Sequence, residues 1–363
     1  MMSILIYSFI FTYIILTLFG LIGIYIHIKK KKKQTLKYDF IQLEEVTLLI
    51  PFRDEALRIK PLLNSMIHAK KLPKSIVFID DQSVDDTSKI IRNLLSNIHY
   101  KIIQTKDPGK KNALNTGIKE VNTKYILTMD ADVVFHPGYF LYLEQQKDTD
   151  MMIFPVKMSS KGYQKLFELD IYMINSLNLI ADGFKRPIVA SGANLLFKKA
   201  VYDEINTLSI HNHILSGDDQ FLLADFNRHK KDVQIIIKNQ LAIETPVPST
   251  LKELINQRLR WIQKTPKVND NYALFLGSIQ VITTILFLLL LITTLNQKLY
   301  IQSIALILSK YFCDFFIAYH LLKSIKKKQL LPWLLIYELL LPVYTVMLGL
   351  LSLFMKPVWK KDN

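Results

Sequence analysis

The chain has 363 residues, of which 50% are hydrophobic and 21% are charged. A typical soluble domain carries about 25% charged residues, and a mean hydropathy of +0.20 excludes an ordinary soluble enzyme. The hydrophobic residues are concentrated before residue 29 and after residue 271. The 20 Phe and 17 Tyr exclude a disordered chain, and the single cysteine, Cys313, excludes a disulfide framework or a cysteine-based zinc site. The composition therefore indicates a membrane protein with one sizeable insert exposed to water.

The first apolar segment, Met1–Ile28, contains no Asp, Glu, Lys or Arg and is long enough to cross a hydrocarbon layer of about 30 Å. A basic run, Lys29–Lys33, follows it, whereas a secretory signal peptide carries its basic residues in front. We therefore predict a retained anchor with its amino end outside and its lysines in the cytoplasm. A cleaved signal peptide is the alternative.

Three further apolar stretches follow the insert: Tyr272–Leu295, Leu299–Leu322 and Leu330–Met355. The second of these contains Lys310 and Asp314, which a helix would place on one face, where they can neutralise each other. An ion pair inside the membrane is either functional or a structural pair within a helix bundle. The sequence leaves both interpretations open.

The last stretch, Leu330–Met355, contains Glu338 and Pro342. If it crosses the membrane, the basic tail at Lys356–Lys361 lies outside, against the usual charge distribution. If Pro342 breaks it into a re-entrant hairpin, the tail stays inside. The sequence does not decide between the two.

The formal net charge of +15 comes partly from lysines that flank the apolar spans. In that position they meet anionic lipid headgroups. Nucleic-acid binding would instead need a basic stripe with aromatic residues on a soluble face. The basic composition therefore predicts a membrane, and no nucleic acid, as a partner.

From Val46 to Glu244, short apolar runs that end in polar turns alternate with helical patterns. Strands are predicted over residues 46–51, 75–80, 100–104 and 124–129, and helices over 55–68, 88–97 and 221–228. Nearly continuous apolar strands between helices are typical of a parallel sheet covered on both faces. The prediction is an α/β domain with a mostly parallel, Rossmann-type sheet, in which ligands bind beyond the carboxyl ends of the strands.

Polar and acidic residues follow three of these strands, at Pro51–Glu55, Asp80–Thr87 and Asp130–Asp132. Grouped carboxylates are costly unless a cation or hydrogen-bond donors neutralise them. Mg²⁺ or Mn²⁺ would do so and would take phosphate oxygens as further ligands. The glycine turn at Pro108–Asn112 lacks the Ser or Thr of a Walker-type phosphate loop.

An Asp-x-Asp sequence occurs a second time, at Asp148–Asp150. This copy lies in the polar stretch Glu144–Asp150, so a solvated turn is predicted for it. Asp130 and Asp132 differ because they directly follow an apolar strand, and only this copy is predicted to be functional.

Two downstream clusters each allow a functional and a structural interpretation. Asp218 and Asp219 open a predicted helix, where they would cap it or, beside a bound diphosphate, supply a general base. Gln257, Arg260 and Trp261 share one face of a predicted helix. This second group would either anchor an interfacial helix or provide an arginine for diphosphate charge and an aromatic platform for a sugar ring or lipid headgroup.

Taken in order, these motifs resemble the membrane-bound inverting family 2 glycosyltransferases, the branch with cellulose, hyaluronan and poly-N-acetylglucosamine synthases and ceramide glucosyltransferases. The resemblance covers about residues 46 to 265 and also includes the Gly109–Asn115 segment and the Gly192–Asn194 turn. One departure is Asp218–Asp219, where the family usually has Glu-Asp, which leaves the choice of base between them open.

The resemblance implies a GT-A-like fold and a role for each matching residue. Pro51, Arg53, Glu55 and Asp80 or Asp81 would hold the uracil and ribose of a UDP-sugar, with Lys110 as a further donor contact. Asp130 would touch the ribose and the Mg²⁺ or Mn²⁺ ion, and Asp132 would coordinate that ion. Asp219, or else Asp218, would be the base, Arg260 would offset leaving-group charge, and Gln257 and Trp261 would line the acceptor side. A single displacement would invert the anomeric carbon.

The predicted organisation is a transmembrane anchor (residues 1–28), a basic linker (29–45), a cytoplasmic catalytic domain (46–249), an interfacial helix (250–268) and a membrane region of two or three helices (269–363). We expect a bacterial inner-membrane protein. The donor sugar and the oligomeric state are not predicted.

The preferred acceptor is a lipid or lipid-linked molecule that enters from the bilayer beside an interfacial helix at Lys161–Ala181. Transfer to a growing glycan by a processive polysaccharide synthase is the alternative. A more distant alternative is a haloacid-dehalogenase-type phosphatase, in which Asp130 would be the nucleophile and Asp132 the acid.

Overall fold

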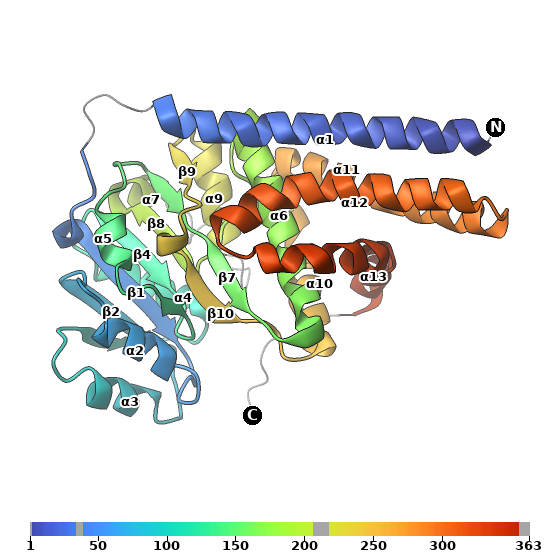
Figure 1. Ribbon diagram of the computed structural model, residues 1–363. Helices are drawn as coiled ribbons and strands as arrows, with labels where there is room; N and C mark the ends of the chain where they lie inside the picture. The colour runs from blue at the N-terminus through green and yellow to red at the C-terminus, as the bar shows by residue number, and fades with distance from the viewer. Residues whose placement is uncertain (1, 34–38, 206–217, 356–363) are drawn as a thin grey trace. The chain divides into compact units, whose positions relative to one another are not determined.

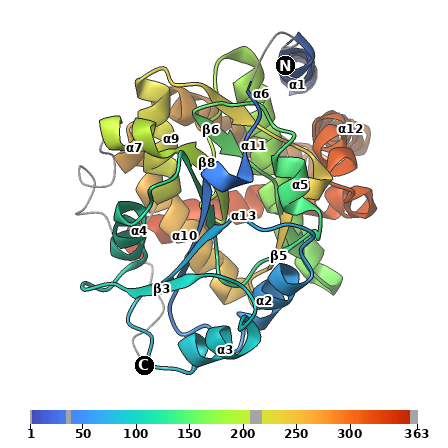
Figure 2. The same ribbon diagram turned by 90° about the vertical axis from the view of Figure 1, so that its left-hand side faces the viewer.

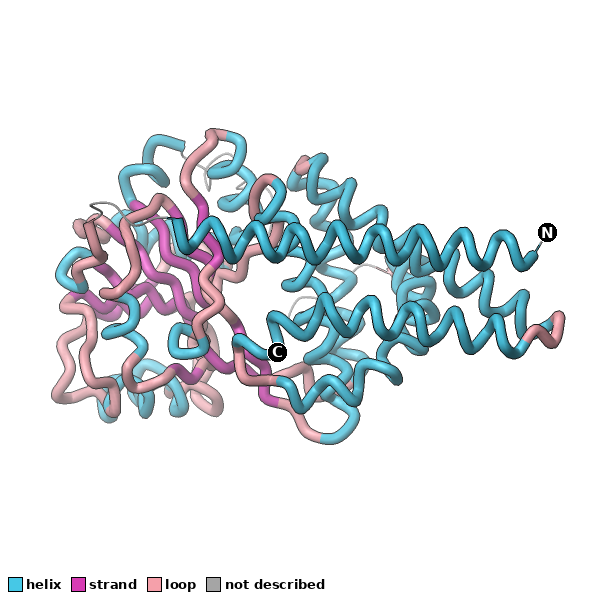
Figure 3. Tube along the Cα trace, turned by 45° about the horizontal axis from the view of Figure 1, so that its top comes forward, coloured by secondary structure: helices cyan, strands magenta, loops and turns pink. Residues whose placement is uncertain are grey.

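The computed structural model describes residues 2–33, 39–205 and 218–355 (Figure 1). The chain divides into two compact units, each of which is described by itself. The membrane-helix unit comprises residues 1–33, 160–188 and 247–363, and the sheet unit comprises 34–159 and 189–246. Within the described residues every strand belongs to the sheet unit, whereas the membrane-helix unit is built from helices (Figure 3).

The sheet unit is organised around a seven-stranded sheet in the order β3-β2-β1-β4-β8-β6-β9. Its strands are β1 (Val46–Phe52), β2 (Ser75–Asp80), β3 (Lys101–Gln104), β4 (Tyr125–Met129), β6 (Met151–Ile153), β8 (Asn194–Lys198) and β9 (Val233–Ile235). The first four run parallel, β8 runs antiparallel to β4 and β6, and β6 runs parallel to β9. The prediction of a mostly parallel α/β sheet is therefore confirmed.

A second sheet of three strands has the order β5-β10-β7. These strands are β5 (Val134–Phe135), β10 (Ile243–Pro246) and β7 (Val156–Ser159). Along the chain, β5 follows β4, β7 follows β6, and β10 is the last strand of the unit. The helices of the unit are α2 (Lys60–Ile67), α3 (Thr87–Leu94), α4 (Lys110–Lys119), α5 (Tyr139–Leu143), α7 (Lys199–Ile205) and α9 (Asp218–Arg228), with short 3₁₀ turns η1 (Leu43–Glu45) and η3 (Asn239–Leu241).

The hydrophobic core lies on the central strands. All seven residues of β1 and all five of β4 are buried, because helices and loops cover both faces of the sheet there. Helices α2 and α3 pack together (Figure 2), and α4 packs on β1 and β2. Gly117 permits that approach, since a Cβ atom at this position would lie 2.5 Å from Ile79 Cδ1.

The first predicted helix begins later than the sequence indicated. Helix α2 starts at Lys60 rather than near Glu55 because side chains of the loop after β2 bind the preceding backbone. Glu55 N–H donates to the Thr87 hydroxyl at 2.9 Å, and Ala56 N–H donates to Asp85 at 2.9 Å. These side-chain acceptors compete with helix formation and hold residues 53–59 as a loop.

In the described part of the membrane-helix unit, four helical segments are long and apolar enough to cross a membrane: residues 2–30, 271–296, 300–324 and 328–354. They belong to α1 (Met2–Lys33), α11 (Asn271–Asn296), α12 (Tyr300–Ser324), and the turn η4 (Lys328–Trp333) with α13 (Leu334–Phe354). Helix α13 continues through Pro342, so the predicted alternative of a hairpin broken at this proline is wrong. The basic tail at residues 356–361 lies outside the described residues.

Two more helices complete this unit, α6 (Lys165–Phe184), preceded by the turn η2 (Gly162–Gln164), and α10 (Leu251–Val268). Helix α6 packs on α1, α12 and α13. At its contact with α1 the two backbones meet directly, because a Cβ atom on Gly183 would lie 1.8 Å from the Gly23 carbonyl oxygen. Only glycine allows helices to approach so closely.

Candidate functional site

Asp54 holds the loop after β1 against the loop after β2, whereas Asp80 makes hydrogen bonds within its own loop. Asp54 has a positive φ of 51° and accepts a hydrogen bond from Val84 N–H at 2.9 Å. Asp80 accepts from Ser83 N–H at 2.7 Å and from the Ser88 hydroxyl at 3.1 Å. The predicted donor residue Asp80 is therefore engaged in shaping its own loop, and its neighbour Asp81 points elsewhere.

Asp81 connects the end of β2 to the start of α4. It is 5% exposed, and its carboxylate accepts a hydrogen bond from Gly109 N–H at 2.6 Å. Burial raises its pKa, while this hydrogen bond and the charge of Arg53 oppose the rise. Gly109 precedes α4 with a φ of +118°, a conformation that favours glycine.

The next residue, Lys110, reaches the end of β4. Its Nζ atom lies 2.5 Å from Asp130 Oδ1, and both side chains are about one-third exposed, at 37% and 34%. Consecutive residues Gly109 and Lys110 thus contact Asp81 and Asp130, which follow different strands of the sheet.

Asp132 lies two residues farther along the chain, beside a like charge. Burial raises its pKa most, and the negative charge of Asp130 raises it further. Arg58 and Lys110 act in the opposite direction but do not cancel the rise. The carboxylate pair is therefore short of positive charge, a condition that a bound cation would relieve.

Asp219 is brought to the same edge of the sheet by the turn before β8. Gly192 N–H donates to its Oδ2 at 3.0 Å, and Gln220 N–H donates to its Oδ1 at 2.8 Å. Gln220 Nε2 also donates to the Ala190 carbonyl at 2.7 Å, which fixes the start of α9 against this turn. Asp218 begins α9, but its side chain lies outside what the structure describes.

Asn194 holds this turn at the carboxyl end of β4. It pairs with Met129 in the antiparallel β4–β8 register and is completely buried. Its side chain donates to the Pro155 and Leu241 carbonyls at 2.9 and 3.0 Å and accepts from Tyr139 Oη at 2.7 Å. With its hydrogen bonds satisfied, Asn194 locks the turn that carries Gly192.

The structure thus brings four predicted carboxylates to one edge of the sheet: Asp81, Asp130, Asp132 and Asp219. They come from β2, β4 and α9, and the edge is formed by the carboxyl ends of the parallel strands. In this type of sheet, ligands bind at this edge. Of the loop after β1, Arg53 and Glu55 are partly exposed and Pro51 is buried within β1.

A metal site made by protein groups alone is absent from the described residues. Within 2–33, 39–205 and 218–355, no three His, Cys, Asp or Glu side chains are arranged to hold an ion. Mg²⁺ needs only one or two carboxylates when substrate phosphates complete its shell. The Asp130–Asp132 pair, with the raised pKa of Asp132, fits an ion that arrives with a phosphorylated substrate.

Gln257, Arg260 and Trp261 belong to α10 of the membrane-helix unit, where Arg258 contacts the first and the last of them. The Arg258 guanidinium lies 4.2 Å from the centroid of the Trp261 ring and donates to Gln257 Oε1 at 2.7 Å. Its Nε donates to the buried Asp170 of α6. Arg260 is partly buried, and this burial lowers its pKa.

Sequence reasoning missed both Arg258 and Lys111. Lys111 is 5% exposed, and its Nζ lies 5.6 Å from the ring centroid of Phe221, which connects α4 to α9. Each is a basic residue next to a predicted site residue: Lys111 follows Lys110, and Arg258 follows Gln257. The local sequence does not show that Lys111 and Arg258 are the buried members of these pairs.

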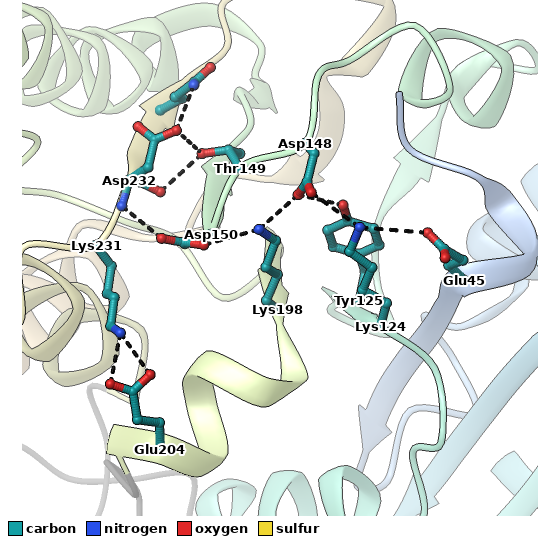
Figure 4. Close-up of polar contacts among 11 residues, drawn as sticks. Glu45, Lys124, Tyr125, Asp148, Thr149, Asp150, Lys198, Glu204, Lys231 and Asp232 are labelled. Atoms are coloured by element: carbon teal, nitrogen blue, oxygen red, sulfur yellow. Dashed lines mark hydrogen bonds and ion pairs between the residues drawn. The ribbon is translucent and has the colours of Figure 1, made fainter. Parts of the chain in front are cut away.

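The second Asp-x-Asp copy lies at the opposite edge of the sheet, at the start of β6, where two lysines pair with it (Figure 4). Asp148 accepts hydrogen bonds from Tyr125 Oη at 2.6 Å and Lys124 Nζ at 3.1 Å, and lies 2.9 Å from Lys198 Nζ. Asp150 pairs with Lys198 at 3.1 Å and accepts from Asp232 N–H at 3.0 Å. The predicted solvated turn is therefore corrected to a half-buried, ion-paired junction.

Comparison with known proteins identifies the domain. Residues 47–205 match the family model described as Glycosyl transferase family 2. The chain contains a family 2 glycosyltransferase domain. The matched segment includes Asp81, Lys110, Asp130 and Asp132 but ends before Asp219.

Two curated relatives of this domain are poly-beta-1,6-N-acetyl-D-glucosamine synthases. The one from Staphylococcus epidermidis is 25% identical over 272 residues, which cover 71% of this chain and 65% of the relative. The one from Staphylococcus aureus is 26% identical over 240 residues, which cover 64% of this chain and 57% of the relative. The match therefore spans less than two-thirds of these synthases.

A solved structure shares the fold of the family 2 domain and its helices. The mannosyltransferase PcManGT from Pyrobaculum calidifontis, in complex with GDP-Man and Mn²⁺, aligns with a TM-score of 0.53 and 12% identity. The alignment covers 98% of this chain and 99% of that one. The GT-A-like fold is therefore confirmed, and the family match favours a glycosyltransferase over the phosphatase alternative.

Proposed function

We propose that this protein transfers a sugar from a nucleotide sugar to an acceptor hydroxyl at a membrane, with inversion of the anomeric carbon. The observation that carries the proposal is the gathering of Asp81, Asp130, Asp132 and Asp219 at the ligand-binding edge of a family 2 glycosyltransferase domain. Asp219, the remotest of these along the chain, is held there by backbone N–H groups.

The donor side is formed by the loops after β1, β2 and β4. Asp81 and the segment Pro51–Glu55 bind the nucleoside, and Lys110 attracts the diphosphate. Asp130 and Asp132 would hold a Mg²⁺ or Mn²⁺ ion, which would neutralise diphosphate charge. The likeness to synthases of poly-N-acetylglucosamine supports UDP-N-acetylglucosamine as the first donor to test, and the complex of the mannosyltransferase with GDP-Man supports GDP-mannose as the second.

Asp219 acts as the general base. Each of its oxygens accepts one backbone N–H and keeps a lone pair for a further hydrogen bond. It takes the proton of the acceptor hydroxyl while that oxygen bonds to the anomeric carbon. The bond from this carbon to the diphosphate oxygen breaks at the same time, and the nucleoside diphosphate leaves with the electron pair.

The acceptor is a lipid, a lipid-linked molecule or a glycan. The relatives' names support a growing N-acetylglucosamine polymer. The packing of α6 on three candidate membrane helices supports an acceptor that enters from the bilayer. Gln257, Arg260 and Trp261 serve the acceptor and the leaving diphosphate in this proposal. In this proposal the sheet unit faces the cytoplasm of a bacterial cell, where it meets the nucleotide sugar.

The test is incubation of the purified full-length protein with radiolabelled donors, Mn²⁺ or Mg²⁺ and total membrane lipid. Transfer of label from one nucleotide sugar, lost in Asp219→Asn with donor binding retained, is expected. A general base contributes about 10²- to 10⁴-fold, so the loss has that size. Full activity of Asp219→Asn would move the base to Asp218, and absence of transfer with every donor contradicts the proposal. A ladder of products indicates a polymerase, and a single product indicates one transfer to lipid.

A further inference from the structure

A buried polar cluster lies within three of the candidate membrane spans and has no part in the proposed transfer. Lys310 and Asp314 come from α12, Tyr13 from α1 and Glu338 from α13. Lys310 is 1% exposed and Glu338 is 3% exposed, and the other two side chains are also buried. A polar group at such a position is costly unless it is paired, so the contacts within the cluster must account for each charge.

Asp314 is the well-satisfied carboxylate of the cluster. Tyr13 Oη donates to both of its oxygens, at 2.8 and 3.0 Å, and Lys310 Nζ donates to Oδ2 at 2.6 Å. The same Nζ atom also donates to Glu338 Oε2. Lys310 is therefore shared between two carboxyl groups on two different helices.

Among the residues that the structure describes, no second cation contacts the cluster. Helix α11 contributes the Phe287 ring, 5.8 Å from Lys310 Nζ, and carries no Asp, Glu, Lys, Arg or His. On α13, the neighbouring Tyr337 donates to Asp170 of α6 at 3.2 Å, and that carboxylate is paired with Arg258. If Asp314, Glu338 and Lys310 were all ionised, one negative charge would stay unbalanced, at a cost of several kcal/mol inside a membrane.

Glu338 Oε1 is the atom of the cluster at which a further positive charge can bind. This atom is buried and has no hydrogen-bond partner. The Asp314 and Glu338 carboxyl groups are neighbours, because one ammonium group, Lys310 Nζ, contacts Oδ2 of the first and Oε2 of the second. Two ionised carboxylates cannot form a hydrogen bond with each other because both are only acceptors, whereas a protonated carboxyl group can donate one.

We propose that the cluster of Tyr13, Lys310, Asp314 and Glu338 binds one proton between the carboxyl groups of Glu338 and Asp314. The proton resides on Glu338, because Asp314 already accepts three hydrogen bonds and is the better-stabilised anion. A metal cation would need several oxygen ligands, and within the described residues no such set of acidic side chains is present. The bound proton makes the cluster neutral and joins α1, α12 and α13 through a closed hydrogen-bond network.

Charge balance predicts how many protons the cluster holds in each variant. Glu338→Gln removes the protonated group, and Asp314→Asn makes Glu338 the only counter-ion of Lys310, so neither variant holds a proton. Lys310→Gln removes the ammonium and leaves two carboxyl groups to be protonated. Asp170→Asn, the control, changes a buried carboxylate that is paired with an arginine and leaves the cluster intact.

The test is infrared spectroscopy of the full-length protein in lipid nanodiscs at pH 7, where a protonated carboxyl group gives a separate carbonyl band. We expect this band in the natural protein and in Asp170→Asn, its loss in Glu338→Gln and in Asp314→Asn, and a stronger band in Lys310→Gln. A natural protein without the band, or a band that survives Glu338→Gln, overturns the proposal. A band that arises only after Na⁺ and K⁺ are replaced by a bulky organic cation would assign a metal ion instead and also overturns it.

Thermal unfolding gives a second measurement that does not depend on assigning the band. Glu338→Gln replaces a neutral acid with a neutral amide of similar shape, so its midpoint should stay close to that of the natural protein. Lys310→Gln removes the cation of the cluster and should lower the midpoint strongly. An equally strong decrease in Glu338→Gln would show that Glu338 is ionised, contrary to the proposal.

Discussion

The two Asp-x-Asp segments, Asp130–Asp132 and Asp148–Asp150, lie at opposite edges of one sheet and differ in how their charge is balanced. Three cationic or phenolic groups bind Asp148, and Lys198 bridges it to Asp150. At the other edge, one partly exposed lysine contacts Asp130, and Asp132 is half-buried beside a like charge. The same three-residue pattern therefore supports the fold in one place and leaves unbalanced charge for a ligand in the other.

The largest expected effect comes from Asp132. Asp132→Asn should reduce sugar transfer by about 10²-fold or more, because it removes a group proposed to hold the divalent ion. The unfolding midpoint should stay the same or rise, since the variant removes a repelled charge. Measuring nucleotide affinity with and without Mn²⁺ checks this. An affinity that responds to Mn²⁺ as in the natural protein would remove Asp132 from the donor site.

Asp148→Asn is the matched variant at the other edge. It should lower the stability of the fold and leave sugar transfer unchanged, the reverse of Asp132→Asn. It weakens charge-assisted hydrogen bonds from Tyr125, Lys124 and Lys198, so we expect a loss of about 1–3 kcal/mol in the free energy of unfolding. Transfer per folded molecule should be unchanged. A strong loss of activity in folded Asp148→Asn would show that the comparison between the two edges is wrong.

The pH dependence of stability sharpens the comparison, because the two pKa shifts have opposite signs. Burial would raise the pKa of Asp148, but hydrogen bonds from Tyr125 and the lysines outweigh it and hold the pKa below its usual value. Its contribution is present above about pH 4 and is lost as the pH falls through the lowered pKa. Asp132 has a raised pKa, so its contribution is present below about pH 4 and is lost as the pH rises through that pKa.

Thermal unfolding across acidic to neutral pH measures both effects. The destabilisation caused by Asp148→Asn should shrink below about pH 4. Asp132→Asn should become more favourable, relative to the natural protein, as the pH rises above that value. Parallel curves for the two variants would contradict the assigned shifts.

Much of the fold was predictable because the central strands are continuously apolar. The run before Asp80 defines β2 to the residue, and the runs before Pro51 and Asp130 define β1 and β4 to within one residue. Since parallel strands end at one edge, the grouping of Asp81 and Asp130 followed from these strands alone.

The contacts that depend on distant partners were not predictable. Asp170, which pairs with Arg258, lies 88 residues away in the sequence, and the charge pattern around Gln257–Trp261 does not indicate it. The same limit applies to Asp148, whose lysine at position 198 enters only through the antiparallel strand β8. Local sequence shows which residues carry charge, but tertiary structure decides which charges are balanced.

The smallest expected effect is that of Lys110→Ala on stability. The Lys110–Asp130 pair is about one-third exposed, so its loss should change the free energy of unfolding by about 0–1 kcal/mol. Lys198→Ala, which removes a less exposed lysine between two carboxylates, should lower the free energy of unfolding more.

Donor affinity should respond in the reverse order: Lys110→Ala is expected to weaken nucleotide-sugar binding by about tenfold, or about 1.4 kcal/mol, and Lys198→Ala to leave it unchanged. Titration calorimetry with the nucleotide measures this, and unchanged affinity in Lys110→Ala would reduce its contact with Asp130 to an ordinary surface ion pair. The two lysines would then differ only in burial, and the donor site would have to draw its positive charge from another residue.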